Sequence, residues 1–202
     1  MKVEVLSRTE LHRGFLGLEK IRLRYQRFDG QMSPEVDLEI MLRNDSVAVL
    51  PYDPPRDMLI LIRQFRVGIH LAGESGWSLE MVAGGCTDQD LPANARRELL
   101  EEIGWEAIAL QPMLSIYPTP HISKERLHLF LAIIDSEKKS APGGGLFSEN
   151  EDIQIVPMPF SQAMERVAAG QFDNPTIFLG MHWLARHRDA LRQQTAYGND
   201  AS

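Results

Sequence analysis

Three glutamates lie close together in the segment Arg97 to Trp105, which reads Arg-Glu-Leu-Leu-Glu-Glu-Ile-Gly-Trp. Glu98 is three positions from Glu101 and four from Glu102, so on an α-helix the three carboxylates share one face. Like charges at this spacing destabilise a helix by roughly a few tenths of a kcal/mol per pair. A divalent hard cation such as Mg²⁺ would offset that repulsion and would still bind phosphate oxygens. The segment therefore indicates either a metal site for phosphate chemistry or a solvated acidic face crossed by ion pairs.

Two neighbouring features favour the metal site. The glycine turn Ala83-Gly84-Gly85 precedes the acidic segment and ends a predicted strand, so that the backbone there can approach a ligand closely. A second acidic cluster, Ser148-Glu149-Asn150-Glu151-Asp152, follows the glycine-rich stretch Pro142-Gly143-Gly144-Gly145. Taken alone, this cluster fits an ordinary polar turn equally well.

The elements that must position these residues follow the order strands, helix, strands, helices. We predict strands over residues 20–28, 36–43, 46–50, 58–65, 77–82, 127–134 and 153–156, and helices over 91–103, 161–169 and 175–192. The helix over 91–103 carries the glutamates. Asp90 is a good N-cap for it, Pro92 suits its first turn, and Gly104 can adopt the left-handed conformation that ends a helix. This order predicts a mixed α/β class with a sheet covered on two faces.

Composition narrows the class of protein. The chain of 202 residues fits one domain with a small extra module, and no stretch approaches the roughly 20 apolar residues that cross a membrane. The N-terminus does not read as a signal peptide, and the single cysteine, Cys86, suits a reducing compartment, so we expect the cytoplasm. The loop position of Cys86 allows its exposure to solvent. The net charge of −7 argues against a nucleic-acid partner.

The stretch from Gly84 to Trp105 resembles the Nudix box, whose pattern is Gly, five residues, Glu, seven residues, then Arg-Glu-apolar-x-Glu-Glu-x-Gly-apolar. The second half of the pattern is matched in full from Arg97 to Trp105. The first half differs, because Gln89 stands in place of the first Glu and the loop from Gly84 is one residue shorter. These differences bear on the geometry of the loop and on metal occupancy.

The resemblance extends from about Phe15 to Arg188 and is closest to the bacterial ADP-ribose pyrophosphatase branch of the Nudix hydrolases. It is carried by residues 28–33, 61–66, 79–84, 123–126 and 149–153. This resemblance implies an α/β/α Nudix sandwich with a mixed sheet over residues 44–202. It also implies a small N-terminal antiparallel sheet over residues 1–43, exchanged between the subunits of a homodimer.

The resemblance assigns roles to the acidic residues. It implies two or more Mg²⁺ ions (Mn²⁺ is possible), held by the backbone carbonyl of Ala83 and by the carboxylates of Glu98, Glu101, Glu102 and Glu151. Glu149 matches the general base that takes a proton from the attacking water, and Arg97 matches a residue that holds the glutamates in place. The reaction implied is hydrolysis of ADP-ribose to AMP and ribose 5-phosphate.

The resemblance also implies substrate contacts. Arg43 and Arg66 match positions that contact ADP-ribose, and Phe15 matches an aromatic residue that stacks on adenine across the dimer. From its sequence context alone, Phe15 could equally be a core residue. The remaining implied contacts are Glu39, Gly85, Thr119 and Glu125. Leu38 stands where the family has an arginine, which weakens the inference for the adenosine side.

Two alternatives to ADP-ribose hydrolysis remain open. Another nucleoside-diphosphate sugar, such as GDP-mannose or UDP-glucose, could be the substrate. A non-catalytic, ligand-sensing Nudix domain would be expected to lose the helix glutamates, and all three are present. His121 and His128 are seven residues apart without a cysteine partner and are expected to occupy ordinary loop or strand positions rather than a metal site.

Overall fold

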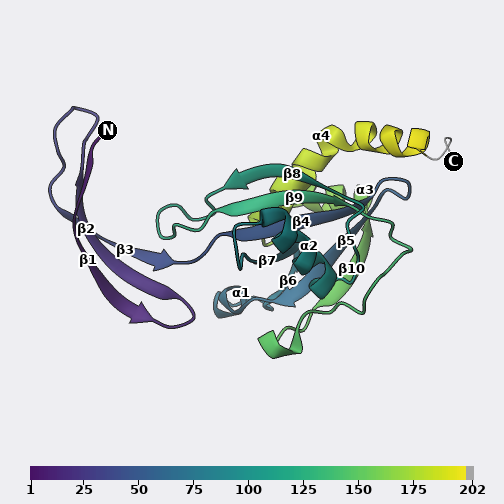
Figure 1. The fold of residues 1–202 in the computed structure, drawn as a ribbon, viewed down its shortest axis with the longest axis horizontal. Coiled ribbons are helices and arrows are strands. Elements are labelled where there is room, and N and C mark those ends of the chain that lie inside the picture. The colour runs from purple at the N-terminus through teal and green to yellow at the C-terminus, as the bar shows by residue number, and fades with distance from the viewer. Residues whose placement is uncertain (199–202) are drawn as a thin grey trace. The chain divides into compact units, whose positions relative to one another are not determined.

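The computed structural model describes residues 1–198, which form two compact units (Figure 1). The first unit comprises Met1–Asp45 together with Ile116–Leu127. The second comprises Ser46–Ser115 and the chain from His128 onward. Within residues 1–198, no helix combines the length and apolar character that a membrane-spanning helix requires.

The first unit is built on a three-stranded antiparallel sheet in the order β1-β2-β3, as expected for the N-terminal region. Its strands are β1 (Val3–Arg13), β2 (Gly17–Tyr25) and β3 (Val36–Leu42). The sequence did not predict β1. Register shifts at Val5/Ser7 and Glu10/His12 interrupt its two-residue alternation, and all of its residues are exposed, so no hydrophobic pattern marks the strand.

The second sheet has the order β10-β5-β4-β9-β8, with β6 paired to β5 and β7 paired to β4. Its strands are β4 (Ser46–Asp53), β5 (Met58–Phe65), β6 (Trp77–Glu80), β7 (Val82–Gly85), β8 (Ala109–Ile116), β9 (Leu127–Ile133) and β10 (Gln154–Pro159). The helices are α1 (Val67–Leu71), α2 (Leu91–Glu102), α3 (Phe160–Ala168) and α4 (Pro175–Gly198), with a short 3₁₀ turn, η1 (Phe147–Glu149).

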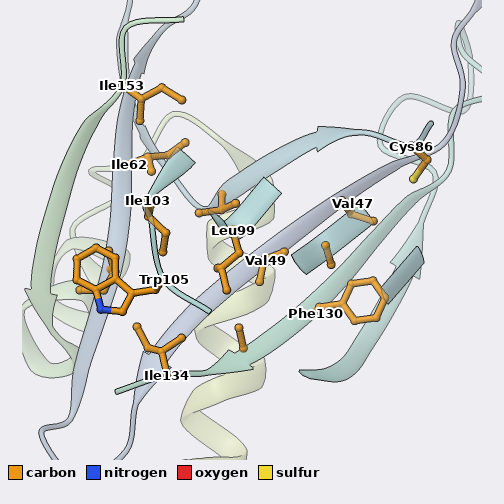
Figure 2. Close-up of a cluster of buried hydrophobic side chains, with 14 residues drawn as sticks. Val47, Val49, Ile62, Cys86, Leu99, Ile103, Trp105, Phe130, Ile134 and Ile153 are labelled. Carbon is orange, nitrogen blue, oxygen red and sulfur yellow. The ribbon is translucent and has the colours of Figure 1, made fainter. Parts of the chain in front are cut away.

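The two faces of this sheet bury different side chains. Val47 and Val49 of β4 point to the face that packs against Leu99 of α2 and against Ile103, the C-cap residue of that helix, as Figure 2 shows. On the opposite face, a Cβ at Gly180 of α4 would lie 2.8 Å from Met81 Sδ and 3.5 Å from Leu50 Cδ2, so this helix packs closely on the sheet. The predicted α/β class and the sandwich of helices around a mixed sheet are therefore confirmed.

Two expectations need correction, and two elements of this unit were not predicted. Cys86 is not exposed: it directly follows β7 and is buried in the core cluster with Val47 and Phe130 (Figure 2). The strand predicted over 77–82 is two strands, which separate at Met81 and pair with different neighbours. Neither β8 nor α1 was predicted, since Pro112 interrupts the pattern of β8 and α1 has only five residues.

Candidate active site

Helix α2 carries the three glutamates and begins at a defined N-cap residue. The Asp90 side chain accepts a hydrogen bond from the Ala93 N–H at 3.0 Å, and Pro92 lies in the first turn, as the sequence predicts. Gly104 follows the helix with φ of +84°. Glu98 and Glu102 lie on the buried face of the helix, only 7% and 1% exposed, while Glu101 is partly buried. The spacing of the glutamates thus places two of them where water has little access.

Arg97 binds two of the glutamates. Its guanidinium donates to Glu98 Oε1 at 2.6 Å and to Glu101 Oε2 at 2.7 Å. It also donates to the carbonyl oxygen of Gly85 at 3.1 Å, which links α2 to the end of β7. This arrangement can hold the carboxylates in a fixed geometry.

Glu102 is the most buried of the helix carboxylates. Its Oε2 accepts a hydrogen bond from the Ala83 N–H at 3.1 Å, but its Oε1 is buried with no hydrogen-bond partner. Burial raises the pKa of Glu102 to about 9, and the nearby carboxylates of Glu98 and Glu151 add to this effect. Burial likewise raises the pKa of Glu98, against the opposing effect of Arg97. Negative charge is therefore concentrated here without full compensation by protein groups.

Gly84 allows the acidic face of α2 to approach β7. A Cβ at this position would lie 2.0 Å from Glu98 Oε1 and 2.1 Å from Glu98 Cδ, so that any larger residue would displace the carboxylate. This close approach to α2 occurs despite the shortened loop that follows Gly84 and the exposed Gln89 within it. Gly85, at the end of β7, is exposed.

The second acidic cluster lies between η1 and β10. Glu149 is the last residue of η1 and is exposed, and Asn150 follows with φ of +56°. Glu151 is partly buried, and its Oε2 accepts a hydrogen bond from the Leu146 N–H at 3.0 Å. Because the charge of Glu151 acts on both Glu98 and Glu102, Glu151 belongs to the same electrostatic site as the helix carboxylates.

Glu80 is a residue of this site that the sequence reasoning missed. Glu80 is 2% exposed, and its carboxylate accepts two hydrogen bonds from Arg66 Nε and one from Arg66 Nη2, the last at 2.7 Å. Burial would lower the pKa of Arg66, but Glu80 outweighs that effect, and the charges of Glu102 and Glu151 raise it further. Arg66 is thus held by Glu80 beside the acidic site. The signal that could have identified Glu80 is an acidic residue inside the strand predicted over 77–82.

The chemistry of these donors fits a divalent hard cation. All the side-chain candidates are carboxylates, and the unpartnered Glu102 Oε1 is the kind of buried anionic oxygen that a cation stabilises. Within residues 1–198, no group of three or more His, Cys, Asp or Glu side chains is drawn into a compact cluster. Several of their oxygens are bonded instead to Arg97 and to the Leu146 N–H.

Five of the predicted substrate residues belong to the first unit. Phe15 is 97% exposed in the turn between β1 and β2, which rules out the core alternative. Arg43 Nε lies 3.8 Å from Glu125 Oε2, and the Thr119 carbonyl accepts hydrogen bonds from two backbone N–H groups. Glu39, also exposed, lies on β3 next to Leu38.

The two histidines occupy the ordinary positions expected of them. His121 lies in a loop of the first unit and is exposed. His128 lies on β9, where its Nδ1 is 2.8 Å from Ser115 Oγ on β8. This contact links neighbouring strands of the second sheet.

The sequence of this chain is similar to those of known enzymes. The family profile of the NUDIX domain matches residues 42–177. The ADP-ribose pyrophosphatase of Escherichia coli (strain K12) is 37% identical over 195 residues, which cover 96% of this chain and 93% of that protein. The GDP-mannose pyrophosphatase of Cronobacter sakazakii is 32% identical over 184 residues, which cover 90% of this chain and 95% of that protein.

A solved structure supports the fold. The structure described as "Crystal structure of ADP compounds hydrolase" has a TM-score of 0.70 and covers 93% of this chain and 96% of that chain, at 22% sequence identity. The profile match spans the glycine turn, α2 and the second acidic cluster. Together with the identity and coverage of the relatives, this match shows that the chain belongs to the Nudix family of hydrolases.

Proposed function

We propose that this Nudix hydrolase cleaves the pyrophosphate bond of ADP-ribose, with Mg²⁺, to give AMP and ribose 5-phosphate. The observation that carries the proposal is the buried acidic site of α2, in which Glu102 Oε1 has no protein partner and the Glu98 and Glu151 charges lie nearby. The 37% identity to an ADP-ribose pyrophosphatase over 96% of the chain supports the choice of substrate.

The residues that would hold the metal ions are those that approach the acidic face of α2. Nudix hydrolases generally use divalent metal ions, and we assign two or more Mg²⁺ ions here, with Mn²⁺ as a possible replacement. Bound Mg²⁺ neutralises and polarises the pyrophosphate oxygens. The proposed ligands are the Ala83 carbonyl and the carboxylates of Glu98, Glu101, Glu102 and Glu151.

Glu149 is the proposed general base. It lies on an exposed turn two residues from Glu151, where water can reach it. Its carboxylate takes a proton from a water molecule as that water attacks a phosphorus atom of the pyrophosphate and the bridging P–O bond breaks. Arg97 does not take part in this step and instead orients Glu98 and Glu101, which it binds at 2.6 and 2.7 Å.

The proposed substrate contacts are divided between the two units. In the second unit, Gly85 and Arg66 lie beside the acidic site, and the Arg66 guanidinium suits phosphate or ribose oxygens. The proposed contacts in the first unit are Phe15, Glu39, Arg43, Thr119 and Glu125. The exposed ring of Phe15 is free to stack on a base.

A second candidate substrate class is another nucleoside-diphosphate sugar. Two observations favour it: the 32% identity to a GDP-mannose pyrophosphatase, and Leu38, which is 46% exposed and offers no charge to a ligand. The net charge of −7 supports a small phosphorylated substrate rather than a nucleic acid. The single, buried cysteine is consistent with our assignment to the cytoplasm.

The first prediction tests metal dependence and substrate together. With ADP-ribose, GDP-mannose and UDP-glucose as substrates, phosphate release after a coupling phosphatase should be highest for ADP-ribose in Mg²⁺. It should disappear in excess EDTA, because the donor set contains only oxygen ligands for a hard cation. Full turnover in EDTA would overturn the metal assignment. If ADP-ribose were the poorest substrate of the three, the nucleotide-sugar alternative would replace it.

The second prediction concerns Leu38. A charge-assisted hydrogen bond contributes roughly 1.5 to 3 kcal/mol, so its absence can raise KM about tenfold or more. Leu38→Arg should therefore sharpen the preference for ADP-ribose, measured as the ratio of kcat/KM values for ADP-ribose and GDP-mannose. Leu38→Lys is the matched control for charge without a guanidinium fork. An unchanged ratio in Leu38→Arg would show that another residue contacts the adenosine side.

We also propose that the protein is a homodimer in which the β1–β3 sheet is exchanged between subunits. Isolated small sheets are marginally stable, and every residue of β1 is exposed, including Val3, Val5 and Leu11. A second copy of the chain would cover these apolar side chains and could bring Phe15 to the partner's active site.

The third prediction follows from this proposal. Light scattering should give a particle of twice the 22.9 kDa chain mass. Val5→Lys with Leu11→Lys should shift the protein toward the monomer, because both substitutions place charge on the strand to be covered. The matched control, Glu106→Lys, changes the charge of an exposed residue of the second unit. A fully active wild-type monomer would contradict the proposal.

A further inference from the structure

A glycine-rich segment binds the C-terminal end of α2. The Gly144 N–H donates to the Glu102 carbonyl oxygen at 2.8 Å, and the Gly145 N–H donates to the Glu101 carbonyl oxygen at 3.1 Å. The last carbonyl groups of a helix have no partners within the helix, and here the loop supplies them. We call Gly143, Gly144 and Gly145 the glycine clamp.

The next N–H along the chain binds a carboxylate of the active site. The Leu146 N–H donates to Glu151 Oε2 at 3.0 Å. The base of this loop is closed by two further bonds, from the Ile153 N–H to the Gly144 carbonyl at 3.2 Å and from the Glu151 N–H to the Leu146 carbonyl at 3.2 Å. Three successive N–H groups therefore connect the backbone of Glu101 and Glu102 to the side chain of Glu151.

Larger residues would not fit this segment. Gly143 has φ of +64°, and a Cβ there would lie 2.5 Å from the carbonyl carbon of Ile103. Gly145 has φ of +84°, and a Cβ there would lie 2.6 Å from Glu151 Cβ and 2.8 Å from Glu151 Oε2. One position is thus closed by the backbone at the end of α2 and the other by Glu151 itself.

The loop beyond the clamp is arranged differently. Glu149 lies at the tip, on η1, beside Phe147, which is 95% exposed. Glu151 lies at the base, where the Leu146 N–H, next to the clamp, binds its carboxylate. The same loop therefore carries one carboxylate that is hydrogen-bonded next to the clamp and one carboxylate that is exposed to solvent.

We propose that the glycine clamp is a positioning element that fixes Glu151 in register with the carboxylates of α2. This inference rests on the proposed function, in which Glu98, Glu102 and Glu151 bind metal together. The clamp glycines touch neither metal nor substrate and act through Glu151. The rigid base also separates the metal-binding part of the loop from the exposed tip, which carries the proposed general base.

The test compares three alanine variants of the intact protein. Gly143→Ala and Gly145→Ala alter the clamp. Gly170→Ala is the matched control, because Gly170 has φ of +65° but no atom within 4 Å of its Cβ position. It therefore introduces the same backbone strain as Gly143→Ala without displacing the end of α2. The measurements are Mn²⁺ binding by electron paramagnetic resonance, thermal unfolding, and kcat and KM for ADP-ribose.

Both clamp variants should bind Mn²⁺ about 10- to 100-fold more weakly than wild type, as is typical when the support of a metal ligand is lost. Their kcat should fall at a fixed, limiting Mg²⁺ concentration, while KM at saturating Mg²⁺ should stay within about threefold of wild type. Gly170→Ala should unfold at a lower temperature, as strain alone predicts, yet bind Mn²⁺ like wild type.

The outcomes separate the clamp from the proposed function. If wild type bound no Mn²⁺, the metal assignment would fail and the clamp proposal with it. If wild type bound Mn²⁺ and both clamp variants bound it equally well, only the clamp proposal would fail. Should Gly143→Ala not fold, Gly145→Ala decides alone, since its Cβ meets the side chain of Glu151 rather than the backbone of α2.

Discussion

Glu102→Gln is expected to lower kcat by more than about 10²-fold without destabilising the metal-free protein. The side chain is 1% exposed, and its Oε1 has no hydrogen-bond partner. An amide of the same shape can keep the hydrogen bond from the Ala83 N–H, which is 3.1 Å long in the wild type. It removes a buried acidic group whose ionisation is opposed by burial and by the charges of Glu98 and Glu151. A residue that opposes folding is therefore proposed to be required for catalysis.

The contribution of Glu102 to the free energy of unfolding depends on pH with a definite sign. The folded-state pKa of Glu102 is raised to about 9, above that of an unfolded glutamate. The folded protein therefore binds the proton more tightly, and the stability that this group contributes falls as pH rises from the ordinary glutamate range toward pH 9. Glu102→Gln should remove that part of the pH dependence.

Thermal unfolding in EDTA and steady-state kinetics in Mg²⁺ measure the two effects separately. Glu106→Gln serves as the matched control, since Glu106 is exposed just beyond α2 and should change neither quantity. A clearly lower unfolding temperature of metal-free Glu102→Gln would show that its carboxylate stabilises the fold. Turnover within about threefold of wild type would exclude Glu102 from the metal site.

Glu149→Gln is expected to lower kcat by roughly 10² to 10⁴-fold, with KM nearly unchanged. Glu149 lies at the exposed tip of its loop, outside the buried acidic site, so the substitution should leave metal binding intact. Mn²⁺ binding measured in parallel distinguishes loss of the base from loss of the metal.

Ser148→Ala is the matched control for this experiment, because Ser148 occupies the same 3₁₀ turn and is exposed. It should retain wild-type kcat. If Glu149→Gln also retained it, the general base would have to be another carboxylate, with Glu101 and Glu125 as the next candidates. The metal assignment would not be affected.

The helix of the site could be predicted because its determinants are local. The N-cap Asp90 and the terminal Gly104 act within one helical turn of the residues that they affect. The shared face of Glu98, Glu101 and Glu102 follows from helical periodicity alone. Helical periodicity also accounts for the bond from Arg97 to Glu101, four positions along the helix.

Other features depend on contacts between distant segments. Cys86 is buried although it follows a glycine turn, because it lies in the core cluster to which Leu99 of α2 and Phe130 of β9 also belong. Glu80 can be buried only because Arg66, fourteen positions away, pairs with it. The first strand, β1, is defined by its pairing with β2, since its own pattern is interrupted by two register shifts.

The sequence by itself determined which residues carry the chemistry: helical spacing places carboxylates on one face wherever the helix is packed. Only the tertiary structure decided how those carboxylates are charged and held, because burial depends on what the rest of the chain places around them. Glu102 and Glu149 are both glutamates in acidic clusters, yet one is 1% exposed and the other is solvated. The bonds from Gly144 and Gly145 to α2 span more than forty positions of the chain, and a local pattern contains no information about such a contact.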